Sequence, residues 1–242
     1  MKPRMLSRWT QHGLFVASAV AGAGKTVAAG AIAHVLSQQG LRVGALKPVD
    51  TRSVHRREGL VSEDAELLAH RGDVRFPLDV ICPIRSRDSL PHVLTGETIE
   101  WDLIQRSLNL MKGAVDTLVV EGVGGIMTPL DPTYTNLDLA CWLGLPVVIV
   151  IRPGEEALNQ MLSCLQLVRG VEANVGGIIV NCYDPEKASA ADEKMLFVIE
   201  KLAGAPLLAV LPEEPATQSL GYGIMAAVRT VDWLAITGNA AE

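Results

Sequence analysis

The sequence predicts an α/β protein with a doubly wound, mainly parallel sheet that carries helices on both faces. Short apolar runs typical of buried strands alternate along the chain with segments of helical apolar periodicity, which indicates consecutive βαβ units. Apolar residues make up 49% of the chain, but aromatic residues only 4%. The core therefore consists mostly of Val, Leu, Ile and Ala, as in parallel sheets that are buried on both sides.

The first predicted strand and helix lie near the start of the chain. Residues 14–17 are all apolar and form the strand, and residues 26–39 form the helix. The apolar face of this helix consists of Val27, Ile32, Val35 and Leu36. Gly40 follows as a C-terminal stop signal, and a second strand is predicted at residues 42–46.

The rest of the chain continues this alternation. Apolar runs predict strands at residues 117–121, 146–151, 175–181 and 207–211. Apolar periodicity predicts helices at residues 63–71, 99–112, 135–143, 156–169 and 191–202. We therefore expect one domain that spans residues 1–242, with loose ends at 1–12 and 238–242.

Two stretches depart from the regular pattern. Residues 73–97 contain three prolines and no clear period, so we expect a substrate-facing excursion or an oligomer contact there. Beyond Pro215 the pattern weakens, and no further helix or strand is predicted.

Charge and composition exclude several classes of protein. The formal net charge of −6 argues against a nucleic-acid-binding surface, and charged residues interrupt every apolar stretch that could span a membrane. The cysteines are far apart and form no C-x-x-C pair, which argues against a zinc site or a disulfide framework. They are Cys82, Cys141, Cys164 and Cys182. We expect a cytoplasmic protein with reduced thiols.

Residues 21–26 read A-G-A-G-K-T and lie between an apolar strand and a helix, the context of a phosphate-binding loop. Such a loop directs backbone N–H groups and the positive end of a helix at one point, where a triphosphate binds. Lys25 would reach the outer phosphates, and Thr26 would hold Mg²⁺. The backbone that binds the nucleotide would be that of Gly22, Ala23 and Gly24. The fold would then be P-loop NTPase-like.

This match is incomplete, and a secretory signal is an alternative. The pattern G-x-x-x-x-G-K-[ST] requires glycine where this chain has Ala19, and Ser18 precedes it. Cationic residues within 2–8 precede the apolar run, and small residues within it resemble a cleavage site. Cleavage after Ala21 would, however, remove the first strand, which the next helix and strand need as a neighbour.

Polar residues lie at the carboxyl ends of several predicted strands, which form the edge where open parallel sheets bind ligands. Besides the phosphate loop, the residues at or directly after the ends of predicted strands are Lys47, Glu121, Asn181 and Pro212. Asn181 offers a donor and an acceptor that suit an adenine edge, although asparagines are also common in turns. Pro212 would lie beside the nucleotide.

Glu121 and Asp64 are the candidate carboxylates. Glu121 emerges from an apolar run, where it could ligate Mg²⁺ or position a water beside the γ-phosphate. The nearby Gly122, Gly124 and Gly125 indicate close approach of the backbone to a bound group. Asp64 lies in an acidic run, where a solvated helix face or an N-terminal helix charge is an alternative.

Lys25 and Lys47 are the candidate catalytic cations. Pro48 fixes an extended exit from the strand that ends at Lys47, which directs the ammonium towards the end of the nucleotide. Lys47 would stabilise charge that develops on the acceptor during phosphoryl transfer. An ordinary exposed lysine at a strand end is the alternative.

A further polar cluster contains Arg85, Arg87 and His92. It could receive a carboxylate group of a substrate. Surface arginines and a capping histidine are an equally good interpretation.

Taken together, the motifs resemble those of the dethiobiotin synthetase family over about residues 14–212. The resemblance rests on G-K-T at 24–26, K-P-V at 47–49, D-A at 64–65, L-P-H at 90–92, V-E-G-V-G-G at 120–125 and Asn181. It implies an ATP- and Mg²⁺-dependent enzyme of biotin synthesis. In this family 7,8-diaminononanoate reacts with CO₂ to a carbamate, ATP phosphorylates the carbamate, and the second amine closes a cyclic urea. A homodimer with substrate sites near the interface is also implied.

The resemblance also implies residue roles. Thr26, Asp64 and Glu121 would hold Mg²⁺, while Lys25 and Lys47 would stabilise the phosphoryl and carbamate charges.

Substrate contacts follow from the same resemblance. Thr51 would stand where the family usually has a serine near the substrate, and Gly124 and Gly125 would approach the substrate through their backbone. Asn181 would read the adenine.

The loop itself departs from the family. The family usually reads G-T-D-T-E-V-G-K-T, whereas residues 18–26 read S-A-V-A-G-A-G-K-T. Two hydroxyls and two carboxylates are missing, which should remove contacts on the carbamate and metal side. The backbone contacts to phosphate can persist, because Gly22 and Gly24 keep their flexibility.

Three alternatives stay open. A cobyrinate-type amidoligase would also activate a carboxyl-like oxygen with ATP, on another acceptor. A switch ATPase of the septum-site or plasmid-partition type would hydrolyse ATP without an acceptor, but those proteins typically have a lysine where this chain has Val20. A nucleotide-binding regulator would bind ATP without turnover.

Overall fold

A six-stranded sheet with the order β10-β9-β8-β1-β7-β2 forms the centre of the molecule. All of its neighbouring strands run parallel, as the sequence predicts. The strands are β1 (His12–Ala17), β2 (Val43–Leu46), β7 (Thr117–Glu121), β8 (Val147–Ile151), β9 (Val175–Tyr183) and β10 (Leu207–Pro212). The computed structural model describes residues 5–57, 59–72, 75–87, 94, 98–214 and 220–239.

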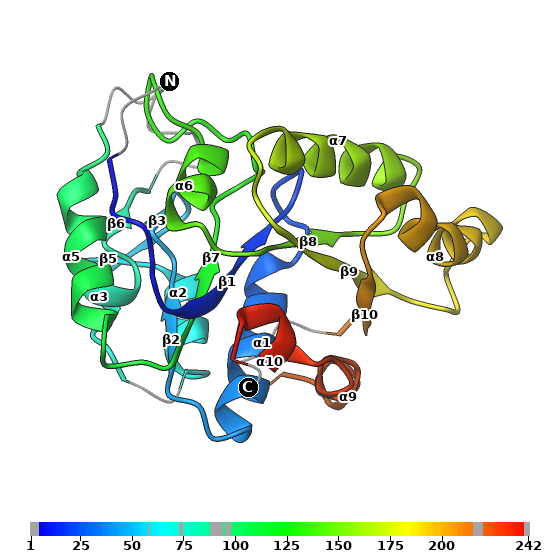
Figure 1. The fold of residues 1–242 in the computed structure, drawn as a ribbon, viewed down its shortest axis with the longest axis horizontal. Helices are drawn as coiled ribbons and strands as arrows, with labels where there is room; N and C mark the ends of the chain where they lie inside the picture. Colours follow the sequence, from blue (N-terminus) through cyan, green and yellow to red (C-terminus); the bar gives the residue numbers. More distant parts are fainter. Residues whose placement is uncertain are drawn as a thin grey trace.

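Helices cover both faces of this sheet (Figure 1). One hydrophobic core includes residues of α5 (Trp101–Met111), α6 (Asn136–Leu143), α7 (Ala157–Gly170) and α8 (Ala190–Ala203). The other includes residues of α1 (Lys25–Gln38), α2 (Glu63–Ala69), α3 (Leu78–Ile81), α9 (Tyr222–Arg229) and α10 (Trp233–Thr237). Among the described residues, no helix has the length and apolar character needed to cross a lipid bilayer.

Successive strand residues contribute alternately to the two cores, because side chains of a strand point to opposite faces of the sheet. In β7, Leu118 and Val120 belong to the first core and Val119 to the second. The middle residues of the strands are therefore apolar on both faces, and the polar side chains of Glu121 and Asn181 lie near the carboxyl ends of β7 and β9. This arrangement places functional groups at the carboxyl edge of the sheet.

Two small sheets extend the structure beyond β2. The strands β3 (Val49–Asp50) and β6 (Ile84–Arg85) pair in parallel, and β4 (Val54–Arg56) pairs with β5 (Gly59–Val61) in an antiparallel hairpin. Within the stretch 73–97, residues 73–74, 88–93 and 95–97 lie outside the described part. The described part includes α3 and β6, which sequence periodicity does not predict because both are very short. Its expected contact with a substrate or a second subunit stays a prediction.

Local sequence explains where two of the helices start and stop. The Thr135 hydroxyl accepts from the backbone N–H of Asp138, whose carboxylate accepts from the backbone N–H of Thr135, so α6 begins with a capping box. Ser189 and Asp192 form the same motif at α8. Gly144 ends α6 in the left-handed conformation, with φ of 68°, which favours glycine.

The described residues before β1 pack against the core, and two helices that the sequence does not predict form beyond residue 215. In the expected loose end 1–12, Leu6 and Trp9 are buried, and His12 begins β1. The backbone N–H of Trp9 donates to the carbonyl of Leu143, so the segment packs beside α6. Beyond residue 215 the chain forms α9 and α10. These helices contain only 8 and 5 residues, so the sequence offers too few turns to reveal a helical period. Residues 1–4 and 240–242 lie outside the described part.

The C-terminal helices are held to the core by Trp233. Its side chain is fully buried, and its indole N–H donates to the carbonyl of Val228 at 2.8 Å. We expect Trp233→Ala to lower the free energy of unfolding by about 3–5 kcal/mol, because it leaves a large cavity. Urea denaturation measures this change. The matched control is Tyr222→Ala, since Tyr222 is 86% exposed; equal losses in the two variants would contradict the expectation.

Candidate active site

The phosphate loop follows β1 and leads directly into α1, as the sequence predicts. Gly22 and Gly24 have φ angles of 77° and 88°, in the left-handed region that favours glycine. A side chain at Gly24 would also overlap the Asn181 amide. Glycine at position 24 is therefore required both by its backbone conformation and by the close approach of β9.

Lys25 is buried against the backbone that follows β7. Its Nζ donates to the carbonyl of Gly124 at 2.5 Å and to the hydroxyl of Ser18 at 3.0 Å. Burial lowers the pKa of Lys25 to about 8; the negative charge of Glu121 opposes this, and the positive charges of Lys47 and Arg52 add to it. In these contacts Lys25 has only neutral oxygen partners, so no carboxylate is bound to its charge.

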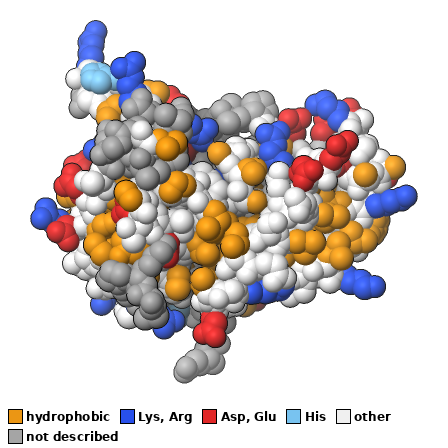
Figure 2. Space-filling model, turned by 90° about the horizontal axis from the view of Figure 1, so that it is seen from above, with side chains coloured by type: hydrophobic (Ala, Val, Ile, Leu, Met, Phe, Trp, Pro, Cys, Tyr) orange, Lys and Arg blue, Asp and Glu red, His pale blue; other side chains and the backbone are white. Residues whose placement is uncertain are grey.

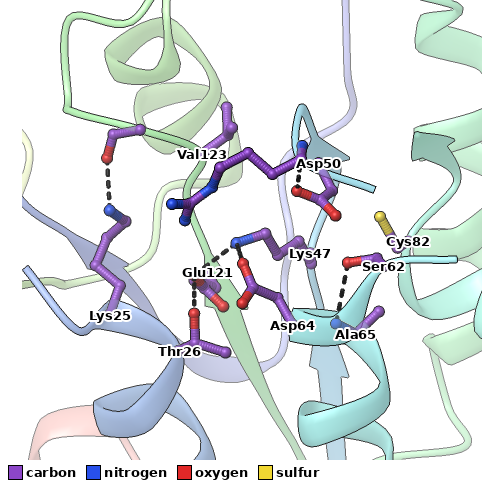
Figure 3. A network of polar contacts seen from close by, with 12 residues as sticks. Lys25, Thr26, Lys47, Asp50, Ser62, Asp64, Ala65, Cys82, Glu121 and Val123 are labelled. Carbon is purple, nitrogen blue, oxygen red and sulfur yellow. Dashed lines mark hydrogen bonds and ion pairs between the residues drawn. The ribbon is translucent and has the colours of Figure 1, made fainter. Parts of the chain in front are cut away.

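Lys47 lies between two carboxylates (Figure 3). Its Nζ is 2.6 Å from Asp64 Oδ2 and 2.6 Å from Glu121 Oε1. Lys47 is 3% exposed and Glu121 1%, so the alternative of an exposed strand-end lysine is wrong. Burial lowers the pKa of Lys47, but the charges of Glu121 and Asp64 outweigh it and raise the pKa above its ordinary value. Lys47 is therefore permanently charged at neutral pH.

The three predicted metal ligands come together around this lysine. The Thr26 hydroxyl donates to Glu121 Oε1 at 2.8 Å, and Asp64 is joined to Glu121 through Lys47. Burial raises the pKa of Asp64, yet Lys47 lowers it more and brings it below its usual range. The Asp64 carboxylate is therefore ionised at neutral pH.

The donor set fits Mg²⁺. Glu121 Oε2 is buried and has no hydrogen-bond partner among the described atoms, which leaves a carboxylate oxygen for a cation. Mg²⁺ binds one or two carboxylates and takes its other ligands from water and phosphate oxygens. No cluster of three or more His, Cys, Asp or Glu side chains occurs in the described part of the chain, so an all-protein cage for a transition metal is not formed there.

A cavity of about 260 Å³ opens beside these groups. It is lined by residues of the phosphate loop, by Lys25 and Lys47, by Glu121 and by the segment that begins at the end of β3. The predicted substrate residues Thr51 and Gly124 line it as well. Gly125 does not, because it packs against the backbone of Ala19, whose carbonyl oxygen an added side chain would overlap.

Asn181 and Pro212 lie at the ends of β9 and β10, outside the residues that line this cavity. Asn181 is buried, and its Nδ2 donates to the carbonyl of Ala23 at 3.0 Å. The Asn181 amide group thus contacts the phosphate loop itself. Contact of Asn181 and Pro212 with the nucleotide stays a prediction.

The predicted polar cluster of Arg85, Arg87 and His92 stays a prediction, because only its two arginines belong to the described residues. Arg85 Nη1 donates to the carbonyl of Leu60 at 3.0 Å, which ties β6 to β5. Neither Arg85 nor Arg87 lines the cavity, and His92 lies outside the described residues.

Four cavity or loop residues escaped the sequence analysis. Ser18 is buried and contacts Lys25, while Asp50, Arg52 and Thr128 line the cavity. Asp50 and Arg52 come shortly after Lys47-Pro48, at the end of a predicted strand. This position could have indicated them as cavity residues, since ligands bind at the carboxyl ends of the strands. Ser18 and Thr128 carry no such signal, because single hydroxyl residues are common in loops.

Comparison with known proteins gives consistent matches. Residues 12–219 match the model of the AAA domain family AAA_26. The ATP-dependent dethiobiotin synthetase BioD of Thermodesulfovibrio yellowstonii is 32% identical over 211 residues, which cover 83% of this chain and 88% of the relative.

Two solved structures share the fold. The septum site-determining protein MinD of Pyrococcus horikoshii, complexed with Mg-ADP, matches with a TM-score of 0.54 and 16% identity, over 93% of this chain and 98% of that one. Cobyrinic acid a,c-diamide synthase of Mycobacterium smegmatis, with bound ADP and magnesium, matches with a TM-score of 0.54 and 19% identity, over 91% and 92%. At these identities the likeness shows the P-loop α/β fold alone.

The lowered pKa of Lys25 predicts a pH-dependent nucleotide affinity. The Lys25 ammonium of the free protein loses its proton as the pH rises through about 8, whereas a bound polyphosphate favours the protonated form. Mg-ATP affinity should therefore fall as the pH rises above 8, by up to about tenfold per pH unit. Calorimetric titration at several pH values measures it. Lys25→Met should bind weakly without this pH dependence; parallel profiles for the two proteins would contradict the role of Lys25.

Proposed function

The chain belongs to the AAA_26 family and to the ATP-dependent dethiobiotin synthetases, and we propose that it closes a cyclic urea on 7,8-diaminononanoate with ATP and CO₂. The observation that carries this proposal is the arrangement of Lys25, Thr26, Lys47 and Glu121 around one cavity. Asp64 completes it through its ion pair with Lys47.

The proposed reaction has three steps. One amine of the substrate attacks CO₂, and a C–N bond forms with loss of a proton, which gives a carbamate. A carbamate oxygen then takes the γ-phosphoryl group of ATP, with release of ADP. Finally the second amine attacks the carbonyl carbon and loses a proton, the bond between this carbon and the phosphorylated oxygen breaks, and inorganic phosphate is released together with the cyclic urea.

ATP supplies the phosphoryl group that turns a carbamate oxygen into a leaving group, and Mg²⁺ neutralises phosphate charge. The loop amides near Gly24 and the Lys25 ammonium would bind the phosphates. Thr26, Asp64 and Glu121 would hold the metal, and the unpartnered Glu121 Oε2 supports this.

Lys47 would stabilise the negative charge that moves between carbamate and phosphate oxygens. Its two ion pairs fix the position of its Nζ and keep it protonated. A preorganised charge of this kind lowers a barrier because it needs no rearrangement during the reaction. Thr51, on the cavity wall, would contact the acceptor.

The unusual loop sequence is compatible with phosphate binding. Its two positive-φ glycines are in place, and Ser18 supplies a hydroxyl to Lys25. The family side chains missing from residues 18–22 would have acted on the carbamate and metal side. We therefore expect the affinities for the acceptor and for Mg²⁺ to be lower than in typical relatives, while the backbone contacts to phosphate persist.

We propose that the enzyme is a cytoplasmic homodimer. Hydrophobic side chains form several groups on the face shown in Figure 2, and α8 exposes Phe197 to 86%. Apolar side chains at this exposure are a common feature of subunit contacts. Light scattering should give twice the chain mass of 25.9 kDa; a monomer at micromolar concentration would contradict this part of the proposal.

The activity is tested directly by product analysis. The protein is incubated with Mg-ATP, bicarbonate and 7,8-diaminononanoate, and the cyclic urea is sought by mass spectrometry. We expect a product that requires all of these components and that Lys25→Ala abolishes, because the γ-phosphoryl group then loses its cation. Lys194→Ala, at an exposed lysine of α8, is the control and should retain activity.

Other outcomes identify other functions. ATP hydrolysis without an acceptor would favour a switch ATPase, and ATP binding without turnover would favour a regulator. Amide formation on a carboxylate acceptor would favour an amidoligase. Each of these, without cyclic urea, would contradict the proposed synthetase activity.

A further inference from the structure

Arg52 lines the same cavity as Lys25 and Gly24, and no motif of the sequence analysis includes it. Its side chain is exposed and makes no hydrogen bond or ion pair within the described part of the chain. A guanidinium group without a partner at the wall of a phosphate-binding cavity is available to a ligand.

The turn that carries Arg52 is fixed by hydrogen bonds. Asp50 is buried; its Oδ1 accepts from the backbone N–H of Arg52 at 3.0 Å, and its Oδ2 accepts from the Ser53 hydroxyl at 2.9 Å. The backbone of this turn also exchanges hydrogen bonds with Ser86, which donates to the Asp50 carbonyl and accepts from the Ser53 N–H. The small β3–β6 sheet therefore holds the turn in place.

This arrangement also uses both oxygens of the Asp50 carboxylate. Asp50 binds its own turn, so its carboxylate is not paired with the Arg52 guanidinium. The two other carboxylates of the site, Asp64 and Glu121, are both paired with Lys47. Among the residues that the structure describes, no carboxylate forms an ion pair with Arg52.

The charge of Arg52 acts on the site. Arg52 and Lys25 both line the cavity, where different elements of the fold bring these residues together. Arg52 thus adds to the positive potential at the cavity, where Lys25 also lacks a carboxylate partner. Two cations on one cavity wall that both lack a carboxylate suit a ligand with more than one anionic group.

We propose that Arg52 is a second phosphate-binding cation of this site, which binds the terminal phosphoryl group of the nucleotide. This inference rests on the proposed function, in which that group moves to an acceptor oxygen. The planar guanidinium presents paired N–H donors that match the oxygens of a phosphoryl group. An arginine in this role stabilises the charge of the group while the bond to ADP breaks and the bond to the acceptor forms.

The test compares two nucleotides that differ in the terminal phosphoryl group. Binding of a non-hydrolysable ATP analogue and of ADP, each with Mg²⁺, is measured by calorimetry on the full chain. We expect Arg52→Gln to weaken binding of the ATP analogue about tenfold and to leave ADP affinity unchanged. The substitution removes a hydrogen bond to the terminal phosphoryl group, which the analogue has and ADP lacks. Arg52→Lys should recover part of the loss, because it keeps the charge without the paired donors.

The control variant is Arg57→Gln, at an exposed arginine in the neighbouring hairpin that does not line the cavity. It should bind both nucleotides as the unmodified protein does. Equal weakening of the analogue and ADP by Arg52→Gln would overturn the proposal, because it indicates a general field effect. Unchanged analogue binding, with a higher KM for the acceptor alone, would overturn it in favour of an acceptor carboxylate.

This binding experiment is independent of product identity. If no cyclic urea forms but Arg52→Gln selectively weakens binding of the ATP analogue, the proposed synthetase activity is wrong and the proposed role of Arg52 is supported. If cyclic urea forms and Arg52→Gln changes the affinities for the analogue and for ADP equally, the proposed activity is supported and the proposed role of Arg52 is wrong.

Discussion

The buried ion-paired lysine Lys47 is the constraint on which the site depends. It joins the end of β2 to α2 through Asp64 and to the end of β7 through Glu121, and Thr26 of α1 binds the same Glu121. Because removal of one partner leaves an uncompensated buried charge, which costs about 3–5 kcal/mol, these elements must keep their relative positions. The fold therefore sets the position of the oxygens proposed to bind Mg²⁺ and of a permanent positive charge together.

The two lysines of the site differ in their electrostatic state, and this difference suits different tasks. Lys47 is bound to carboxylates, and its pKa is raised, so its charge is constant. Lys25 contacts neutral oxygens and has its pKa lowered to about 8, so its charge is free to bind an arriving polyanion. In the loop of this chain the Ser18 hydroxyl is one of those neutral partners.

Much of the fold and of the site could be predicted from the sequence, because both follow from short-range patterns. The apolar run of residues 118–120 is buried on both faces of the sheet, so the Glu121 carboxylate that follows it lies at the carboxyl edge. The G-K-T sequence between a strand and a helix predicts a ligand-facing loop at Lys25 and Thr26, and both residues line the cavity. The burial of Leu6 and Trp9 and the short helix at Trp233 escaped prediction, since each depends on packing with distant segments rather than on periodicity. Arg52 could not be predicted as a site residue from the sequence. The hydrogen bonds that occupy the Asp50 carboxylate, and so leave the Arg52 charge unpaired, are visible only in the three-dimensional structure.

A crystal structure of the protein with Mg²⁺ and a non-hydrolysable ATP analogue tests the central claim most directly. The account predicts that the analogue's phosphates lie on the amides around Gly24, and that Glu121 Oε2 faces the bound ion beside an intact Lys47–Glu121 pair. A nucleotide bound elsewhere on the molecule, or a bound metal with Glu121 Oε2 turned away from it, would contradict the account.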